Sequence, residues 1–167
     1  MKFKKLSVKE YSIYTAIIVF GIILDQLTKL LAVKFLAKVA TVPLINGVLH
    51  LTYVENEGAA FGMLANHRWV FMLTSTVMIL VLAVVLYSGR ISDNKLYTVS
   101  CSMIISGGIG NMIDRTVLGY VIDFIDFRLI NFAVFNGADS IVCIGAGILS
   151  LALILDIKKE MKKEKKN

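Results

Sequence analysis

The sequence predicts an all-α membrane protein with four transmembrane helices and a small β-hairpin or sheet element on the outer side of the membrane. Of the 167 residues, 57% are hydrophobic and only 18% are charged, and the mean hydropathy is +0.75. These values lie outside the range that is usual for soluble domains. Four segments approach the roughly 20 apolar residues that cross a bilayer, and no repeat or linker divides the chain. We therefore expect residues 1–167 to form a single membrane domain.

The four predicted spans are residues 11–29, 69–87, 96–113 and 138–157. The first follows a lysine-rich start, but no small-residue cleavage site follows it, so we expect it to be retained. The second has no charged residue and carries an aromatic residue at each end, as expected where rings lie at both interfaces. The third contains a stripe of small residues that favours close helix packing, and the fourth ends at a lysine run.

Lysines at the two termini predict the orientation of the chain. An even number of spans places both termini on one side, together with the short loop that contains Arg90 and Lys95. The positive-inside rule makes that side cytoplasmic, so the predicted topology is N-in and C-in. We expect membrane lipid to be a partner of these lysines and nucleic acid not to be, because no basic face with interleaved aromatic residues accompanies them.

Two stretches on the outer side are expected to have structure of their own. The runs 42–45 and 48–54 flank Asn46-Gly47, a dipeptide that favours tight hairpin turns, so we expect a small sheet there. Residues 121–135 contain several phenylalanines among branched aliphatic residues, but charged residues interrupt them. We expect this second stretch to rest in the membrane interface.

Asp123 and Asp139 fall on the same outer face of a chain in which a carboxylate is costly to keep. Hydrolysis by two carboxylates needs one ionised group that activates water and one protonated group that polarises the carbonyl. Close approach separates their pKa values, because two like charges do not ionise together cheaply. Such chemistry needs no cofactor, and we predict no metal, since the cysteines and histidines lack ligand spacing.

Spacing alone leaves other pairs of outer aspartates open. Asp25 lies one turn before Lys29, which is typical of an ion pair within a helix near the membrane surface. Asp114 and Arg115 are neighbours that would not face each other on a helix. Asp126 could face water, and Asp139 could simply cap the last helix.

Several sequence motifs narrow the choice of catalytic aspartates. Taken in order and between four spans, they resemble the motifs of the lipoprotein signal peptidase family, also called signal peptidase II: Asp25-Gln-Leu-Thr-Lys29, Asn56-Glu-Gly-Ala-Ala-Phe-Gly62, Gly107-Gly-Ile-Gly-Asn-Met-Ile-Asp-Arg115, Val121-Ile-Asp-Phe124 and Phe135-Asn-Gly-Ala-Asp-Ser140. The resemblance covers almost the whole chain.

The resemblance implies an aspartic endopeptidase of the bacterial cytoplasmic (inner) membrane, with its active site at the outer face. Such an enzyme removes the signal peptide of diacylglyceryl-modified prolipoproteins on the N-terminal side of the lipidated cysteine, and it would act as a monomer without a cofactor. The catalytic dyad falls on Asp123 and Asp139. Residues that support the dyad or bind substrate would be Asn56, Asn111, Asp114, Arg115, Asn136, Asp25 and Lys29.

The sequence departs from the family pattern at three places near these motifs. Glu55 stands where a basic residue is common, Gly137 replaces a branched aliphatic residue, and no proline precedes Phe135. Because glycine loosens the backbone, we expect the loop beside Asp139 to be affected.

A small non-catalytic transporter or channel is the alternative from a different class. Its polar residues would continue through the depth of the bundle. The inner halves of spans 69–87 and 138–157 are almost wholly apolar, which favours a site at the interface.

Overall fold

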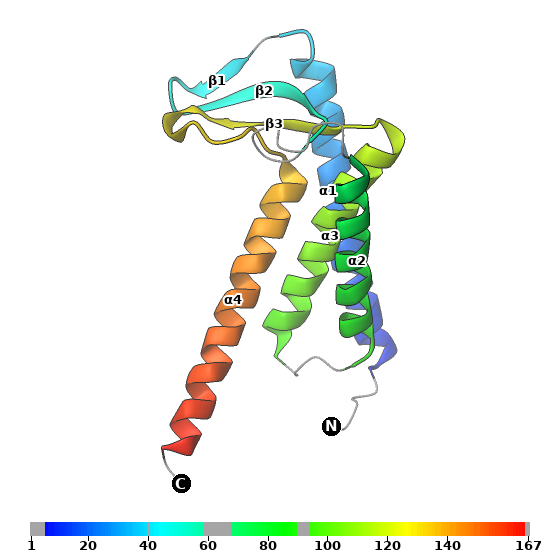
Figure 1. Ribbon diagram of the computed structural model, residues 1–167, viewed down its shortest axis with the longest axis vertical. Helices are drawn as coiled ribbons and strands as arrows, with labels where there is room; N and C mark the ends of the chain where they lie inside the picture. Colours follow the sequence, from blue (N-terminus) through cyan, green and yellow to red (C-terminus); the bar gives the residue numbers. More distant parts are fainter. Residues whose placement is uncertain (1–5, 40, 59–67, 90–93, 166–167) are drawn as a thin grey trace.

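The computed structural model describes residues 6–39, 41–58, 68–89 and 94–165, which form four long helices and a three-stranded sheet. The helices are α1 (Val8–Leu36), α2 (Arg68–Tyr87), α3 (Lys95–Val117) and α4 (Gly137–Glu164). The strands are β1 (Val42–Ile45), β2 (Leu49–Asn56) and β3 (Val121–Phe127), and the short 3-10 helix η2 (Arg128–Ile130) follows β3. The sheet lies across one end of the helices (Figure 1).

All four helices are long and apolar enough to cross a membrane, which confirms the predicted number of spans. Three of the helices extend beyond the predicted spans 11–29, 96–113 and 138–157. α1 continues to Leu36, α3 to Val117 and α4 to Glu164. Charged residues end an apolar run, but lysine and glutamate are good helix formers and do not end a helix. The polar residues near these ends therefore lie on helices, where loops were expected.

The sheet has the order β1-β2-β3, and both pairs are antiparallel. The predicted hairpin is confirmed: β1 and β2 turn at Asn46-Gly47, where Gly47 has a φ of 72° that a residue with a Cβ rarely adopts. The third strand was not predicted, because residues 121–135 were expected only to rest in the interface. β3 pairs with β2 over a long sequence separation, and the turn chemistry that predicted the hairpin carries no information about such a partner.

Glycines on α3 allow the neighbouring helices to approach it closely. A Cβ at Gly110 would collide with the carboxylate of Asp25 on α1, and one at Gly107 would collide with the carbonyl of Ala138 on α4. This is the close packing that a stripe of small residues permits in lipid. It brings the polar residues of α1 and the N-terminus of α4 against the same part of α3.

The sheet is fixed to the bundle through the C-terminal end of α1. Ala32 and Leu36 pack with Ile122 of β3, and Leu51 and Phe124 extend this apolar cluster along the sheet. The other face of β3 carries Asp123, since successive side chains of a strand point to opposite faces. That face is turned toward the polar residues of α3 and α4.

Candidate active site

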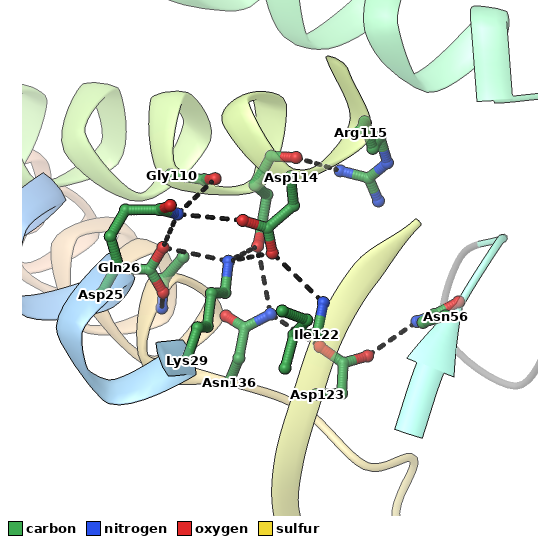
Figure 2. A network of polar contacts seen from close by, with 12 residues as sticks. Asp25, Gln26, Lys29, Asn56, Gly110, Asp114, Arg115, Ile122, Asp123 and Asn136 are labelled. Atoms are coloured by element: carbon green, nitrogen blue, oxygen red, sulfur yellow. Dashed lines mark hydrogen bonds and ion pairs between the residues drawn. The ribbon is translucent and has the colours of Figure 1, made fainter. Parts of the chain in front are cut away.

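Asp123 lies in the middle of β3, where it is paired with Val54 and is 2% exposed. Its Oδ2 accepts a hydrogen bond from Asn56 Nδ2 (2.8 Å), and its Oδ1 accepts one from Asn136 Nδ2 (2.6 Å). The amide of Asn56 is oriented by the backbone N–H of Gly58, which donates to Asn56 Oδ1 (3.0 Å). Asp123 is therefore held from both sides by amide donors (Figure 2).

Asp139 lies in the first turn of α4. It forms a capping box with Asn136: Asp139 N donates to Asn136 Oδ1 (2.9 Å), and Asn136 N donates to Asp139 Oδ2 (3.3 Å). The other carboxylate oxygen, Oδ1, accepts from Asn111 Nδ2 (2.7 Å). The expected helix-capping contact is thus present, and the same side chain also faces the residues around Asp123.

Asn136 and Asn111 connect the two aspartates. Asn136 Nδ2 donates both to Asp123 Oδ1 and to Asn111 Oδ1 (3.1 Å). Asn111 Oδ1 also accepts from Lys29 Nζ (2.9 Å). Because Lys29 can only donate, it fixes the amide oxygen of Asn111 on its own side. The amide nitrogen of Asn111 is consequently turned toward Asp139.

Lys29 lies at the centre of a buried ion cluster that consists of Asp25, Gln26, Lys29 and Asp114 (Figure 2). Its ammonium contacts Asp25 Oδ2 (3.0 Å), Asp114 Oδ2 (2.8 Å) and Asn111 Oδ1, so each of its three N–H donors has an acceptor. Gln26 Nε2 donates to Asp114 Oδ1 (2.9 Å). The predicted ion pair of Asp25 and Lys29 is present between successive turns of α1, and both side chains are at most 2% exposed.

The same cluster holds the backbone next to Asp123 and next to Asp139. Asp114 Oδ2 accepts from the N–H of Ile122, which precedes Asp123 (3.1 Å). Asp25 Oδ1 accepts from the N–H of Ala138, which precedes Asp139 (2.8 Å). Two carboxylates joined by one lysine therefore fix the backbone on both sides of the site.

A cavity of about 350 Å³ opens between β3, α4 and the segment that joins them. It is lined by Asn56, Asn111, Arg115, Val121, Asp123, Phe132, Ala133, Val134, Phe135, Asp139, Ser140 and Cys143. A second cavity of about 340 Å³ lies between α2, α3 and α4 and shares Asn111, Arg115 and Asp139 with the first. The two cavities meet at these three residues.

Burial raises the pKa of Asp123 to about 6. The hydrogen bond from Asn56 acts in the opposite direction, and the nearby charge of Asp139 raises the value further. Desolvation and a like charge are the two effects that separate the pKa values of paired carboxylates. The two aspartates are thus in electrostatic contact, in an environment that allows one of them to hold a proton.

Asp126 does not face water, contrary to expectation, since only 8% of it is exposed. It accepts from Thr52 Oγ1 (2.7 Å) and pairs with Arg128 Nε (2.8 Å). Burial by itself favours its neutral form, but these hydrogen bonds hold the pKa of Asp126 below its usual value. Asp126 therefore belongs to a separate polar group of the sheet.

The structure brings all the residues predicted for the site into one connected network, and it adds Gln26. Gln26 was quoted within a motif but not selected, although a buried carboxylate needs hydrogen-bond donors and Gln26 follows Asp25 directly. Residues 59–62 of the motif that begins at Asn56, and the predicted cytoplasmic Arg90, lie outside the described residues.

The structure shows the contacts of Glu55 and Gly137, two of the residues that depart from the family pattern. Glu55 is exposed and accepts from the hydroxyl of Tyr53 (3.0 Å), on the face of β2 opposite to Asn56. Gly137 is the first residue of α4, and a Cβ there would lie 3.3 Å from Thr28 Oγ1. The cap by Asn136 and the bond from Ala138 to Asp25 hold the backbone on either side of Gly137.

Comparison with known proteins gives one consistent result. The family model described as "Signal peptidase (SPase) II" matches residues 17–155. The lipoprotein signal peptidase of Caldanaerobacter subterraneus subsp. tengcongensis is 48% identical over 139 residues, covering 83% of this chain and 93% of that protein. That of Clostridioides difficile is 42% identical over 145 residues, covering 85% and 95%.

A solved structure agrees with these relatives. A bacterial membrane enzyme determined by the in meso method at 2.3 Å resolution has a TM-score of 0.79 and 30% sequence identity, and the match covers 95% of this chain and 96% of that one. None of these comparisons supports the alternative of a transporter or channel. The chain is a multi-pass membrane protein that belongs to the signal peptidase II family.

Proposed function

We propose that this chain is an aspartic endopeptidase that removes the signal peptide of diacylglyceryl-modified prolipoproteins, cutting on the N-terminal side of the lipidated cysteine. Asp123 and Asp139 form its catalytic dyad. The observation that carries this proposal is that both carboxylates line one cavity and are bridged by Asn136 and Asn111. The names of the relatives support the substrate class.

The reaction uses one ionised and one protonated carboxyl group. The ionised aspartate takes a proton from water as the water oxygen bonds to the scissile carbonyl carbon, while the protonated aspartate donates its proton to the carbonyl oxygen. In the second step the C–N bond breaks, the amine nitrogen receives the proton held by the first aspartate, and the second recovers its own. The raised pKa of Asp123 suits the carboxyl group that holds the proton at rest.

The other predicted residues have supporting roles. Asn56 and Asn136 orient Asp123, and Asn111 orients Asp139. The buried ion cluster does not touch the substrate. It sets the separation of the two aspartates through the N–H groups of Ile122 and Ala138.

The site faces the outer side of the bacterial cytoplasmic membrane, with both termini inside. The lysines at the end of α4 support this orientation. At the opposite end of the bundle, η2 and the segment after it form an interfacial segment, supported by Leu129 and Ile130, each 68% exposed, and Phe132, 49% exposed. The substrate reaches the dyad laterally from the bilayer, and the protein acts as a monomer and as one domain.

Two substitutions test the dyad. Asp123→Asn and Asp139→Asn each keep the shape of the side chain but remove its ability to take and give a proton. We expect each purified variant to lose cleavage of a lipidated precursor by at least about 10³-fold, while remaining folded and inserted. Full cleavage by either variant would exclude the dyad. Parallel assays with a lipidated and an unlipidated precursor test the substrate class.

A further inference from the structure

Asn111, Arg115 and Asp139 are the described residues that line both cavities, and of these three the proposed reaction assigns no role to Arg115. Among the described residues, its hydrogen-bond acceptor is the backbone carbonyl of Asn111, at 3.5 Å from Nη1. None of the ion pairs between described residues includes it. A guanidinium has five N–H donors, so this long bond leaves most of its hydrogen-bonding capacity directed elsewhere.

The ring of Phe71 holds this guanidinium. Phe71 lies near the start of α2, is half-buried, and has its ring centroid 5.4 Å from Arg115 Cζ. An aromatic face attracts a guanidinium without neutralising it, and a guanidinium over a ring keeps its N–H groups accessible at its edge. A carboxylate in the same place would occupy those N–H groups. Phe71 thus positions the cation and leaves its donors accessible.

We propose that Phe71 is a positioning residue, whose ring holds Arg115 at the junction of the two cavities so that its N–H groups bind a carbonyl oxygen of the substrate. The inference rests on the proposed peptidase function. Two parts of the substrate carry a carbonyl oxygen that Arg115 could bind: the peptide backbone and the acyl esters of the diacylglyceryl group. Arg115 borders Asp139 in both cavities, so a carbonyl bound there lies beside the dyad.

The test compares two substitutions of Phe71 in the purified full-length enzyme. Phe71→Leu removes the ring and keeps an apolar side chain, whereas Phe71→Tyr keeps the ring. We expect Phe71→Leu to raise KM for a lipidated precursor by about three- to tenfold and to leave kcat within about twofold, because the lost contact binds substrate and transition state alike. Phe71→Tyr should have the same KM as the unmodified enzyme. The matched control is Phe20→Leu on α1, where the ring is 69% exposed, and it should change neither constant.

A double-mutant cycle separates positioning from packing. With Arg115→Gln already present, Phe71→Leu should raise KM no further, since the cation that the ring holds is gone. An unlipidated precursor used as a competing inhibitor distinguishes the two sources: a raised inhibition constant in Phe71→Leu assigns the peptide carbonyl, and an unchanged one assigns the ester.

Several results would overturn the inference. These are an unchanged KM in Phe71→Leu, a failure of Phe71→Tyr to restore it, an equal loss in the Arg115→Gln background, or a fall in kcat and thermal stability without a change in KM. If the unmodified enzyme cleaves the lipidated precursor, any of these results would refute only the role of Phe71. If the unmodified enzyme does not cleave the precursor, the proposed peptidase function itself would be refuted.

Discussion

Replacing Lys29 by methionine tests the buried ion cluster most directly. Methionine keeps the length of the side chain but removes the ammonium that lies between Asp25 and Asp114. The two carboxylate oxygens that contacted it would then face each other inside the bundle without a cation. Asn111 would also lose the donor that fixes its amide oxygen, so the amide would be free to turn away from Asp139.

The structure gives the size of both effects. Lys29 is 2% exposed and makes all three of its contacts at 3.0 Å or less. Removing one partner of such a buried pair costs about 3–5 kcal/mol, because it leaves an uncompensated buried charge. The cluster also holds the N–H groups beside Asp123 and Asp139, and a misplacement of the catalytic groups by about 1 Å lowers the rate by about 10²-fold.

The measurements are thermal unfolding of the detergent-purified protein, followed by intrinsic fluorescence, and cleavage of a lipidated precursor. Lys34→Met is the matched control, since it is the same change on the same helix at an exposed position. A surface change of this kind alters stability by about 0.5 kcal/mol or less. We expect Lys29→Met to unfold at a clearly lower temperature and to cleave about 10²-fold more slowly, and Lys34→Met to resemble the unmodified protein.

Asp114→Asn combined with Lys29→Met provides a second comparison. It removes one of the two carboxylates that face each other, so it should recover part of the stability lost in Lys29→Met but not the activity, because Ile122 loses its charged acceptor. If Lys29→Met had the stability and the rate of the Lys34→Met control, the cluster would not hold the dyad, and the reasoning would be wrong.

Two further predictions concern the pH dependence and the orientation. Asn56→Ala removes a hydrogen bond that lowers the pKa of Asp123, so that pKa should rise above about 6 and the limb of the kcat/KM profile that reports Asp123 should move to higher pH; a shift to lower pH would contradict this role of Asn56. Single cysteines at Asn46→Cys and Glu160→Cys, in a Cys101→Ala, Cys143→Ala background, should react differently with a membrane-impermeant maleimide. Position 46 should react in intact spheroplasts and position 160 only after lysis, and the reverse pattern would exclude the N-in, C-in topology.

The sequence by itself determined the features that depend on short stretches of residues. Apolar runs gave the four spans, because hydropathy adds up over about 20 neighbouring residues. Asn46-Gly47 gave the hairpin, since that turn depends on its own two residues. The ordered motif blocks gave the family. Hydropathy does not give the helix ends, because α1 and α4 continue through charged residues that end an apolar run without breaking a helix.

Only the tertiary structure decided how the polar residues meet. Asn56 and Asp123 are 67 positions apart, and Asp25 and Ala138 are 113 apart, yet each pair is joined by one hydrogen bond. The pairing of β3 with β2 and the approach of α1 to α3 at Gly110 create these contacts. The spacing of residues along the chain predicts neither the strand pairing nor the helix contact, because both depend on packing between distant segments. That packing buries Lys29 with two carboxylates and places Asp123 and Asp139 at one cavity.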